Sequence, residues 1–199
     1  LAIDETSYEA PFFTSKKDSK HTIKMDEDAY ACSSFKYKEG WASTTPSDEY
    51  TMHVADNLYM NKKFHDAAMQ MIAQTPLNAK KYAYSCVNFI VLKEIAETIS
   101  GMPMDEFLNR EYYVPMKLYH MCYLPLRTHK REEIIPTVKN DCLRGELIQG
   151  FVHDESAAYL GGVSGNAGLF ASAHDVAKVY QMLLNGGEID GKRYLSKST

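Results

Sequence analysis

The sequence lacks several features that would assign a function directly. No apolar run approaches the roughly 18 residues that a membrane span requires, so we expect no transmembrane segment. Acidic residues outnumber basic ones by 26 to 22, and a formal net charge of −4 provides no basic field for nucleic acid or anionic lipid. The N-terminus has neither an initiating Met nor the basic and apolar regions of a signal peptide. We therefore expect a piece of a longer protein that binds no nucleic acid.

Cysteine is also sparse, and its spacing excludes two classes of protein. The 4 cysteines are Cys32, Cys86, Cys122 and Cys142. None belongs to a Cys-x-x-Cys pair, which excludes zinc ribbons and thioredoxin-like redox proteins. Four are too few for a disulfide scaffold in 199 residues, so free and mostly buried thiols are expected.

Metal and cofactor motifs are missing as well. The 7 histidines show no His-Glu-x-x-His spacing, and His153-Asp154-Glu155 is best interpreted as a structural or solvated turn. The glycine-rich residues 161–168 lack the Gly-Lys-Ser/Thr ending of a phosphate-binding loop, so a tight connection into a helix is expected. We predict neither a metal nor a cofactor.

The remaining composition is that of a globular chain, with 45% hydrophobic and 24% charged residues. We expect residues 1–199 to be a fragment with a single domain. Residues 1–50 are polar and rich in loop-forming residues, and their apolar side chains are mainly aromatic. This composition predicts an irregular segment whose aromatic side chains pack on the core. Residues 51–199 are predicted to form a helical subdomain.

Local signals predict the two main helices of that subdomain. Residues 86–100 carry a wide apolar stripe, with Ser85 as N-cap and Gly101 as a left-handed C-cap, which predicts a central helix. A second helix should start at Ser172, run through apolar positions spaced for one face, and end at residues 186–187. The two stripes are expected to pack on each other.

Shorter elements are predicted around these helices. Apolar spacing predicts a helix over residues 63–74 that Pro76 stops. Pro103 is a favoured first helical position and is followed by two acidic residues, which predicts another helix. Asp190-Gly191 predicts a tight hairpin turn.

Two segments together resemble a known family. Residues 84–108 are similar to a Tyr-Ser-Asn loop followed by a helix, a Gly and a short acidic amphipathic helix. Residues 161–196 are similar to a Gly-Gly-Leu-x-Ser-Thr-Ala-x-Asp-Leu helix that ends in Leu-Leu-Asn-Gly-Gly. Their order and spacing resemble the serine beta-lactamase-like family, which includes penicillin-binding proteins and related esterases.

The resemblance implies a catalytic role for Tyr84. Family members attack a carbonyl with the serine of a Ser-x-x-Lys motif and form an acyl-enzyme, while the tyrosine of Tyr-x-Asn shares the proton transfer. Tyr84 matches that tyrosine, but Cys86 stands where the family usually has Asn, and a thiol cannot reproduce the hydrogen bonds of an amide. Tyr84 is therefore expected in a loop with its hydroxyl in an open groove.

The other two motifs of the family are not found. Ser33-Ser34-Phe35-Lys36 fits Ser-x-x-Lys literally, but the residues after it do not form an apolar helix, so we reject Ser33 as nucleophile. The third motif, Lys-Thr-Gly or His-x-Gly, would follow the last predicted helix and is expected to be absent.

The resemblance thus implies a mainly α fold: the helical subdomain of a beta-lactamase/transpeptidase-like fold, with long loops and a small hairpin but without most of the central sheet. It implies a fragment of a serine hydrolase acting on beta-lactams, cell-wall peptides or small esters and amides, inactive alone and derived from an exported parent. The alternative is a non-catalytic binding or scaffold module, which the Cys86 departure favours. Apolar surface left without a sheet is expected to cause self-association.

Overall fold

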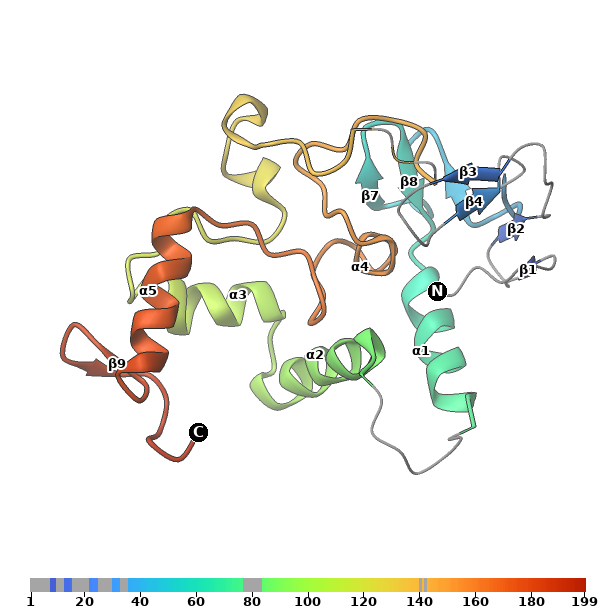
Figure 1. The fold of residues 1–199 in the computed structure, drawn as a ribbon. Helices are drawn as coiled ribbons and strands as arrows, with labels where there is room; N and C mark the ends of the chain where they lie inside the picture. Colours follow the sequence, from blue (N-terminus) through green and yellow to red (C-terminus); the bar gives the residue numbers. More distant parts are fainter. Residues whose placement is uncertain are drawn as a thin grey trace.

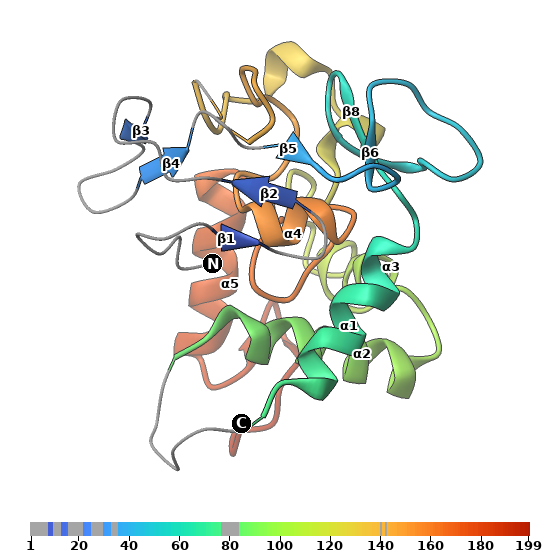
Figure 2. The same ribbon diagram turned by 90° about the vertical axis from the view of Figure 1, so that its right-hand side faces the viewer.

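The computed structural model describes residues 8–9, 13–15, 22–24, 30–32, 36–76, 84–139, 141 and 143–199. Within these residues it contains five α-helices and ten short strands, none longer than four residues. The strands formed by residues 8–60 occupy one side of the molecule and α4 (Glu155–Tyr159) lies in the middle (Figures 1 and 2). α5 (Ala173–Leu184) and the hairpin that follows it lie on the other side. No helix of the described part has the length and apolar character needed to cross a membrane.

The N-terminal part is richer in strands than predicted. The order β1-β2-β5 forms one antiparallel sheet from Tyr8–Glu9, Phe13–Ser15 and Lys36–Tyr37. A hairpin pairs β3 (Thr22–Lys24) with β4 (Tyr30–Cys32). The sequence predicted an irregular segment without long helices, and these short strands were not predicted, because strands of two or three residues leave no alternating pattern in the sequence.

A third small sheet has two of its three strands inside residues 51–199, the region predicted to be helical. It has the order β6-β8-β7, from Ala42–Ser43, Leu58–Met60 and Met52–Ala55. Val54, Ala55 and Met60 are almost fully buried there and begin the larger of two cores. Phe64 at the start of α1 (Phe64–Gln74) and Ala157, Ala158 and Tyr159 of α4 belong to the same core.

Local end signals act as predicted in the two main helices. In α2 (Cys86–Ser100) the Ser85 hydroxyl accepts a hydrogen bond from the Val87 amide at 3.2 Å, and Gly101 ends the helix with φ 69°. In α5 the Ser172 hydroxyl accepts from the Asp175 amide at 3.2 Å. The hairpin of β9 (Glu188–Ile189) and β10 (Lys192–Arg193) turns at Asp190-Gly191, as predicted.

The helix predicted after Pro103 is followed directly by a further helical segment that the sequence did not predict. α3 (Met104–Leu108) has Pro103 as its N-cap and runs directly into a π-helix, η1 (Asn109–Tyr113). Two short 3₁₀ turns follow, η2 (Pro125–Arg127) and η3 (Arg131–Glu133). A second core joins η1 to α5 and β9 through Tyr113, Met116, Met182 and Ile189.

The expected packing of the helices was wrong. α2 packs against α3, which separates it from α5 in Figure 1. Ile90 is the buried residue of α2, whereas Leu92 and Ile99 are 55% and 82% exposed. An apolar stripe predicts that a face can be buried, but it does not identify the element that covers it. The stripes of α2 and α5 consequently remain open in this structure.

Candidate active site

Tyr84 occupies the loop position directly before α2. Its side chain is 70% exposed, and its ring centroid lies 5.8 Å from that of Phe89 in the first turn of the helix. The cap made by Ser85 fixes the backbone that follows. The phenol is therefore held at the start of α2 and presented on an open surface, where a group from elsewhere can reach it.

Cys86 is the first residue of α2 and is a free thiol that is half buried. Cys122 is also free and half buried, so these two thiols are less buried than predicted. Asn88, two residues after Cys86, is exposed to solvent. Ser33, which we rejected as the nucleophile, lies outside the described residues.

The two segments that carry the family resemblance meet in space. Gly165 lies against the first half of α2, where a Cβ atom would stand 2.1 Å from the carbonyl oxygen of Phe89 and 3.3 Å from the Cβ of Lys93. Gly165 is therefore needed because two backbones approach closely, and not because of a positive φ. The glycine-rich connection thus supports the helix that presents Tyr84.

Replacing Gly165 by Ala should destabilise the protein by about 1–3 kcal/mol, since the added methyl group must push α2 away from the loop. The measurement is urea denaturation, with hydrogen exchange of the amides of residues 86–90 as a local readout. Gly186→Ala is the control: its φ is +65° and no atom lies within 4 Å, so it should cost conformational strain alone. Equal rates of hydrogen exchange at the amides of residues 86–90 in the two variants would contradict the proposal that Gly165 supports α2.

Asp154 is structural, as predicted for the turn at residues 153–155. Its carboxylate accepts from the Ala157 amide at 2.8 Å, from the Ser156 hydroxyl and from Asn166 Nδ2 at 3.1 Å. Burial raises the pKa of Asp154, but these hydrogen bonds outweigh burial and lower it. Asp154 therefore caps α4 as a carboxylate and joins it to residues 161–168.

One ion pair joins α1 to α2, and two further ion pairs lie within α2 itself. His65 Nε2 lies 3.0 Å from Glu94, and Lys93 Nζ lies 3.1 Å from Glu94 and 2.8 Å from Glu97. Burial lowers the pKa of His65, but its hydrogen bonds to Glu94 and Asp66 have the larger combined effect and raise it. This network fixes the orientation of the helix behind Tyr84.

Sequence reasoning missed a buried ion pair beside the 153–155 turn. The Arg144 side chain is 0% exposed and the Asp141 side chain 2%, with an N–O distance of 2.6 Å. The same guanidinium donates to the carbonyl oxygens of Val152 and His153 at 2.6 and 2.7 Å. The Asp-x-x-Arg spacing was the only signal available, and such a spacing is far more often found on a solvated surface.

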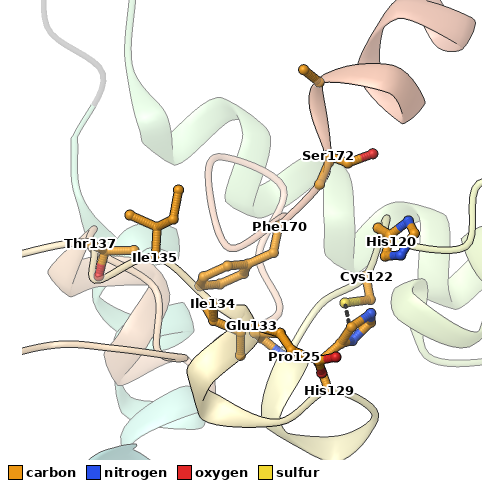
Figure 3. A pocket seen from close by; sticks show the side chains of 12 residues that line it. His120, Cys122, Pro125, His129, Glu133, Ile134, Ile135, Thr137, Phe170 and Ser172 are labelled. Carbon is orange, nitrogen blue, oxygen red and sulfur yellow. Dashed lines mark hydrogen bonds between the residues drawn. The ribbon is translucent and has the colours of Figure 1, made fainter.

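Three cavities among the described residues are lined by other parts of the chain than Tyr84. The largest of the three described here, about 540 Å³, is formed where η2, η3 and the start of α5 meet, with His120, Cys122 and His129 on one wall (Figure 3). A cavity of about 400 Å³ adjoins it at Thr137 and Phe170, and one of about 250 Å³ shares Cys122 and His129 with it. Tyr84 itself is 70% exposed, and its placement in a groove stays a prediction. In the part of the chain that the structure describes, no group of three or more His, Cys, Asp or Glu residues is arranged to hold a metal ion.

Comparison with known proteins identifies the family. The family model described as Beta-lactamase matches residues 40–199 and so includes both segments that meet at Gly165. The chain belongs to the beta-lactamase family. This agrees with the resemblance seen in residues 84–108 and 161–196.

Curated relatives of the chain in this family carry a common name. A protein of Escherichia coli K12 called "Putative D-alanyl-D-alanine carboxypeptidase" is 37% identical over 149 residues, which are 67% of this chain and 34% of the relative. A protein of the same name from Salmonella agona is 35% identical over 155 residues, covering 68% of this chain and 34% of the relative. The chain spans about a third of the length of these relatives.

Solved structures give a weaker match. The octameric penicillin-binding protein homologue of Pyrococcus abyssi aligns over 78% of this chain and 34% of its own, with a TM-score of 0.45 and 17% identity. The D-amino acid amidase of Ochrobactrum anthropi SV3 aligns over 72% of this chain and 42% of its own, with a TM-score of 0.45 and 12% identity. The family assignment rests on the family model and not on these structures.

Proposed function

We propose that this chain is the helical part of a serine hydrolase that works through an acyl-enzyme. The observation that carries the proposal is Tyr84, exposed directly before a capped helix that residues 161–168 support. In this proposal a serine outside the 199 residues adds to a substrate carbonyl. Tyr84 Oη helps to take the serine proton and deliver it to the leaving group, as general acid–base catalysis requires. The central sheet of the family fold is then also contributed by polypeptide outside these residues.

The proposed substrate is a peptide derived from peptidoglycan. The relatives named as carboxypeptidases support this choice, although the chain matches only about a third of their length. A parent acting on such a substrate would be exported to the periplasm or cell envelope. Beta-lactams and small esters or amides are the alternative substrates for the same acyl-enzyme chemistry.

The isolated chain should be catalytically inert, whereas the complete product of its gene should form an acyl-enzyme. Both would be incubated with a fluorescent penicillin, a chromogenic beta-lactam and a nitrophenyl ester. We expect covalent labelling of the complete product alone, because a catalytic nucleophile provides most of the rate enhancement in such enzymes. Labelling of the isolated chain at Ser33 would contradict the proposal. Absence of labelling in both would favour a binding or scaffold module, for which the Cys86 departure is the supporting feature.

We also propose that the isolated chain pairs with a second copy through the open apolar faces of α2 and α5. Ile99 and Leu184, at the C-terminal ends of the two helices, are 82% and 80% exposed, and further apolar side chains on both helices are also exposed. Apolar patches of this kind are rare on monomers, because covering them is favourable.

Light scattering at rising concentration should therefore show a dimer or larger species. Ile99→Asp and Leu184→Asp should shift it toward monomer, whereas the exposed polar change Lys62→Asp should not. A wild-type chain that stays strictly monomeric at high concentration would contradict this proposal.

A further inference from the structure

Cys122 and His129 form a pair of potential metal ligands on the wall of the 540 Å³ cavity, away from the proposed active site. The Cys122 sulfur lies 3.9 Å from His129 Nδ1, and Figure 3 shows the two side chains pointing toward each other. Both residues also line the 250 Å³ cavity. Both residues therefore lie on the walls of two cavities.

The backbone holds both residues in place. Cys122 exchanges two hydrogen bonds with Phe170, each 2.9 Å long, and the His129 amide donates to the Pro125 carbonyl at 2.8 Å. These contacts attach the pair to η2 and to the strand-like segment before α5. Ligands on fixed backbone need little rearrangement when an ion binds.

We propose that Cys122 and His129 bind one soft monovalent cation, of the Cu(I) or Ag(I) type, as a two-coordinate site. Thiolate is a ligand that soft metals such as Cu(I) select, imidazole also suits copper, and such d¹⁰ monovalent ions accept two ligands. With bonds of about 2.3 Å to sulfur and about 2.0 Å to nitrogen, taken from zinc sites, the observed separation gives an angle at the metal of roughly 130°. An increase of the separation by about 0.4 Å would make the arrangement linear.

Charge favours a monovalent ion over a divalent one. On binding, the Cys122 S–H bond breaks, a sulfur–metal bond forms, and the proton passes to water, while His129 Nδ1 donates its lone pair to the metal. Thiolate and monovalent cation cancel, so the half-buried site stays neutral. A divalent ion would leave a net positive charge with only two ligands.

Neighbouring groups do not complete a site for harder metals. The one carboxylate on the cavity wall is that of Glu133, which accepts a hydrogen bond from the Lys130 amide at 2.8 Å. Thr128 Oγ1 lies 2.9 Å from His129 Nδ1, and its hydroxyl would have to turn away for the nitrogen to bind the ion. The His120 ring is exposed, with its centroid 5.9 Å from that of His129, so it serves as a control and not as a ligand.

The test is anaerobic titration of the reduced chain with Ag(I), and with Cu(I) in competition with bicinchoninate. We expect Cys122→Ser to lose one equivalent of bound metal relative to wild type. His129→Ala should lower the affinity for that equivalent of metal by more than about tenfold. Mutation of a residue that only supports a metal ligand already lowers metal affinity by about this factor. His120→Ala should bind like wild type. X-ray absorption should show one sulfur and one nitrogen ligand.

Two results would overturn the proposal. One is an unchanged stoichiometry in Cys122→Ser, which would assign the metal to Cys32, Cys86 or Cys142. The other is that Cys122→Ser loses one equivalent of bound metal while His129→Ala binds metal with unchanged affinity. That result would show that the Cys122 thiol binds the metal without His129. Far-ultraviolet circular dichroism of each variant establishes that it is folded, so a loss of binding can be read as a loss of ligands.

Discussion

Replacing Tyr84 by Phe should lower the acylation rate of the complete gene product by about 10²- to 10⁴-fold, the usual contribution of general acid–base catalysis. The change removes one oxygen and keeps the ring that packs near Phe89. Because the side chain is 70% exposed, stability should hardly change. The measurement is the rate of fluorescent penicillin labelling, with urea denaturation to compare stability.

Tyr119 provides a matched control for this substitution. It is 71% exposed, almost the same fraction as Tyr84, and it lies after η1 rather than at the start of α2. Tyr119→Phe should leave the labelling rate unchanged. If Tyr84→Phe also leaves the rate unchanged in a protein that is labelled, Tyr84 is not the proton-transfer residue of that hydrolase.

Replacing Arg144 by Ala should destabilise the protein by about 3–5 kcal/mol, the typical cost of removing one partner from a buried ion pair. The change would leave the Asp141 carboxylate, whose side chain is 2% exposed, without its cation. It would also remove the donors to the carbonyl oxygens of Val152 and His153, and that of the buried Val152 would then lack this partner. Urea denaturation measures the effect.

Arg131 offers the matching control, because it forms an ion pair with Asp56 on the surface. The two side chains are 37% and 41% exposed. Arg131→Ala should therefore cost less than about 1 kcal/mol. A similar loss of stability in Arg144→Ala and Arg131→Ala would mean that burial of the Asp141–Arg144 ion pair does not determine its contribution to stability.

The parts of the fold that depend on neighbouring residues could be predicted from the sequence. The start and end of α2 follow from Ser85 and Gly101, whose hydrogen bond and φ angle act within a few residues. The turn at Asp190-Gly191 follows in the same way. The arrangement of the helices could not be predicted, because the apolar stripe of α2 does not reveal that α3 lies between it and α5.

In the candidate site, too, features that depend on neighbouring residues could be predicted from the sequence, and features that depend on distant residues could not. The loop position of Tyr84 is a local property and agrees with the prediction, whereas its catalytic role remains a prediction. The close approach of Gly165 to Phe89 joins positions 76 residues apart (165 − 89), and nothing in the glycine-rich stretch identifies its neighbour. The buried Asp141–Arg144 pair was missed because charged residues are usually exposed, and only the tertiary fold shows an exception.

The cap at Ser85 determines the direction in which the Tyr84 phenol points. A helix turns by about 100° per residue, so starting α2 one residue earlier or later would rotate the preceding side chain by about that angle. The hydrogen bond from the Val87 amide to the Ser85 hydroxyl selects one of these starting points. Ser85 therefore sets the direction of the Tyr84 phenol by fixing where the helix starts, although the Ser85 hydroxyl need take no part in the chemistry.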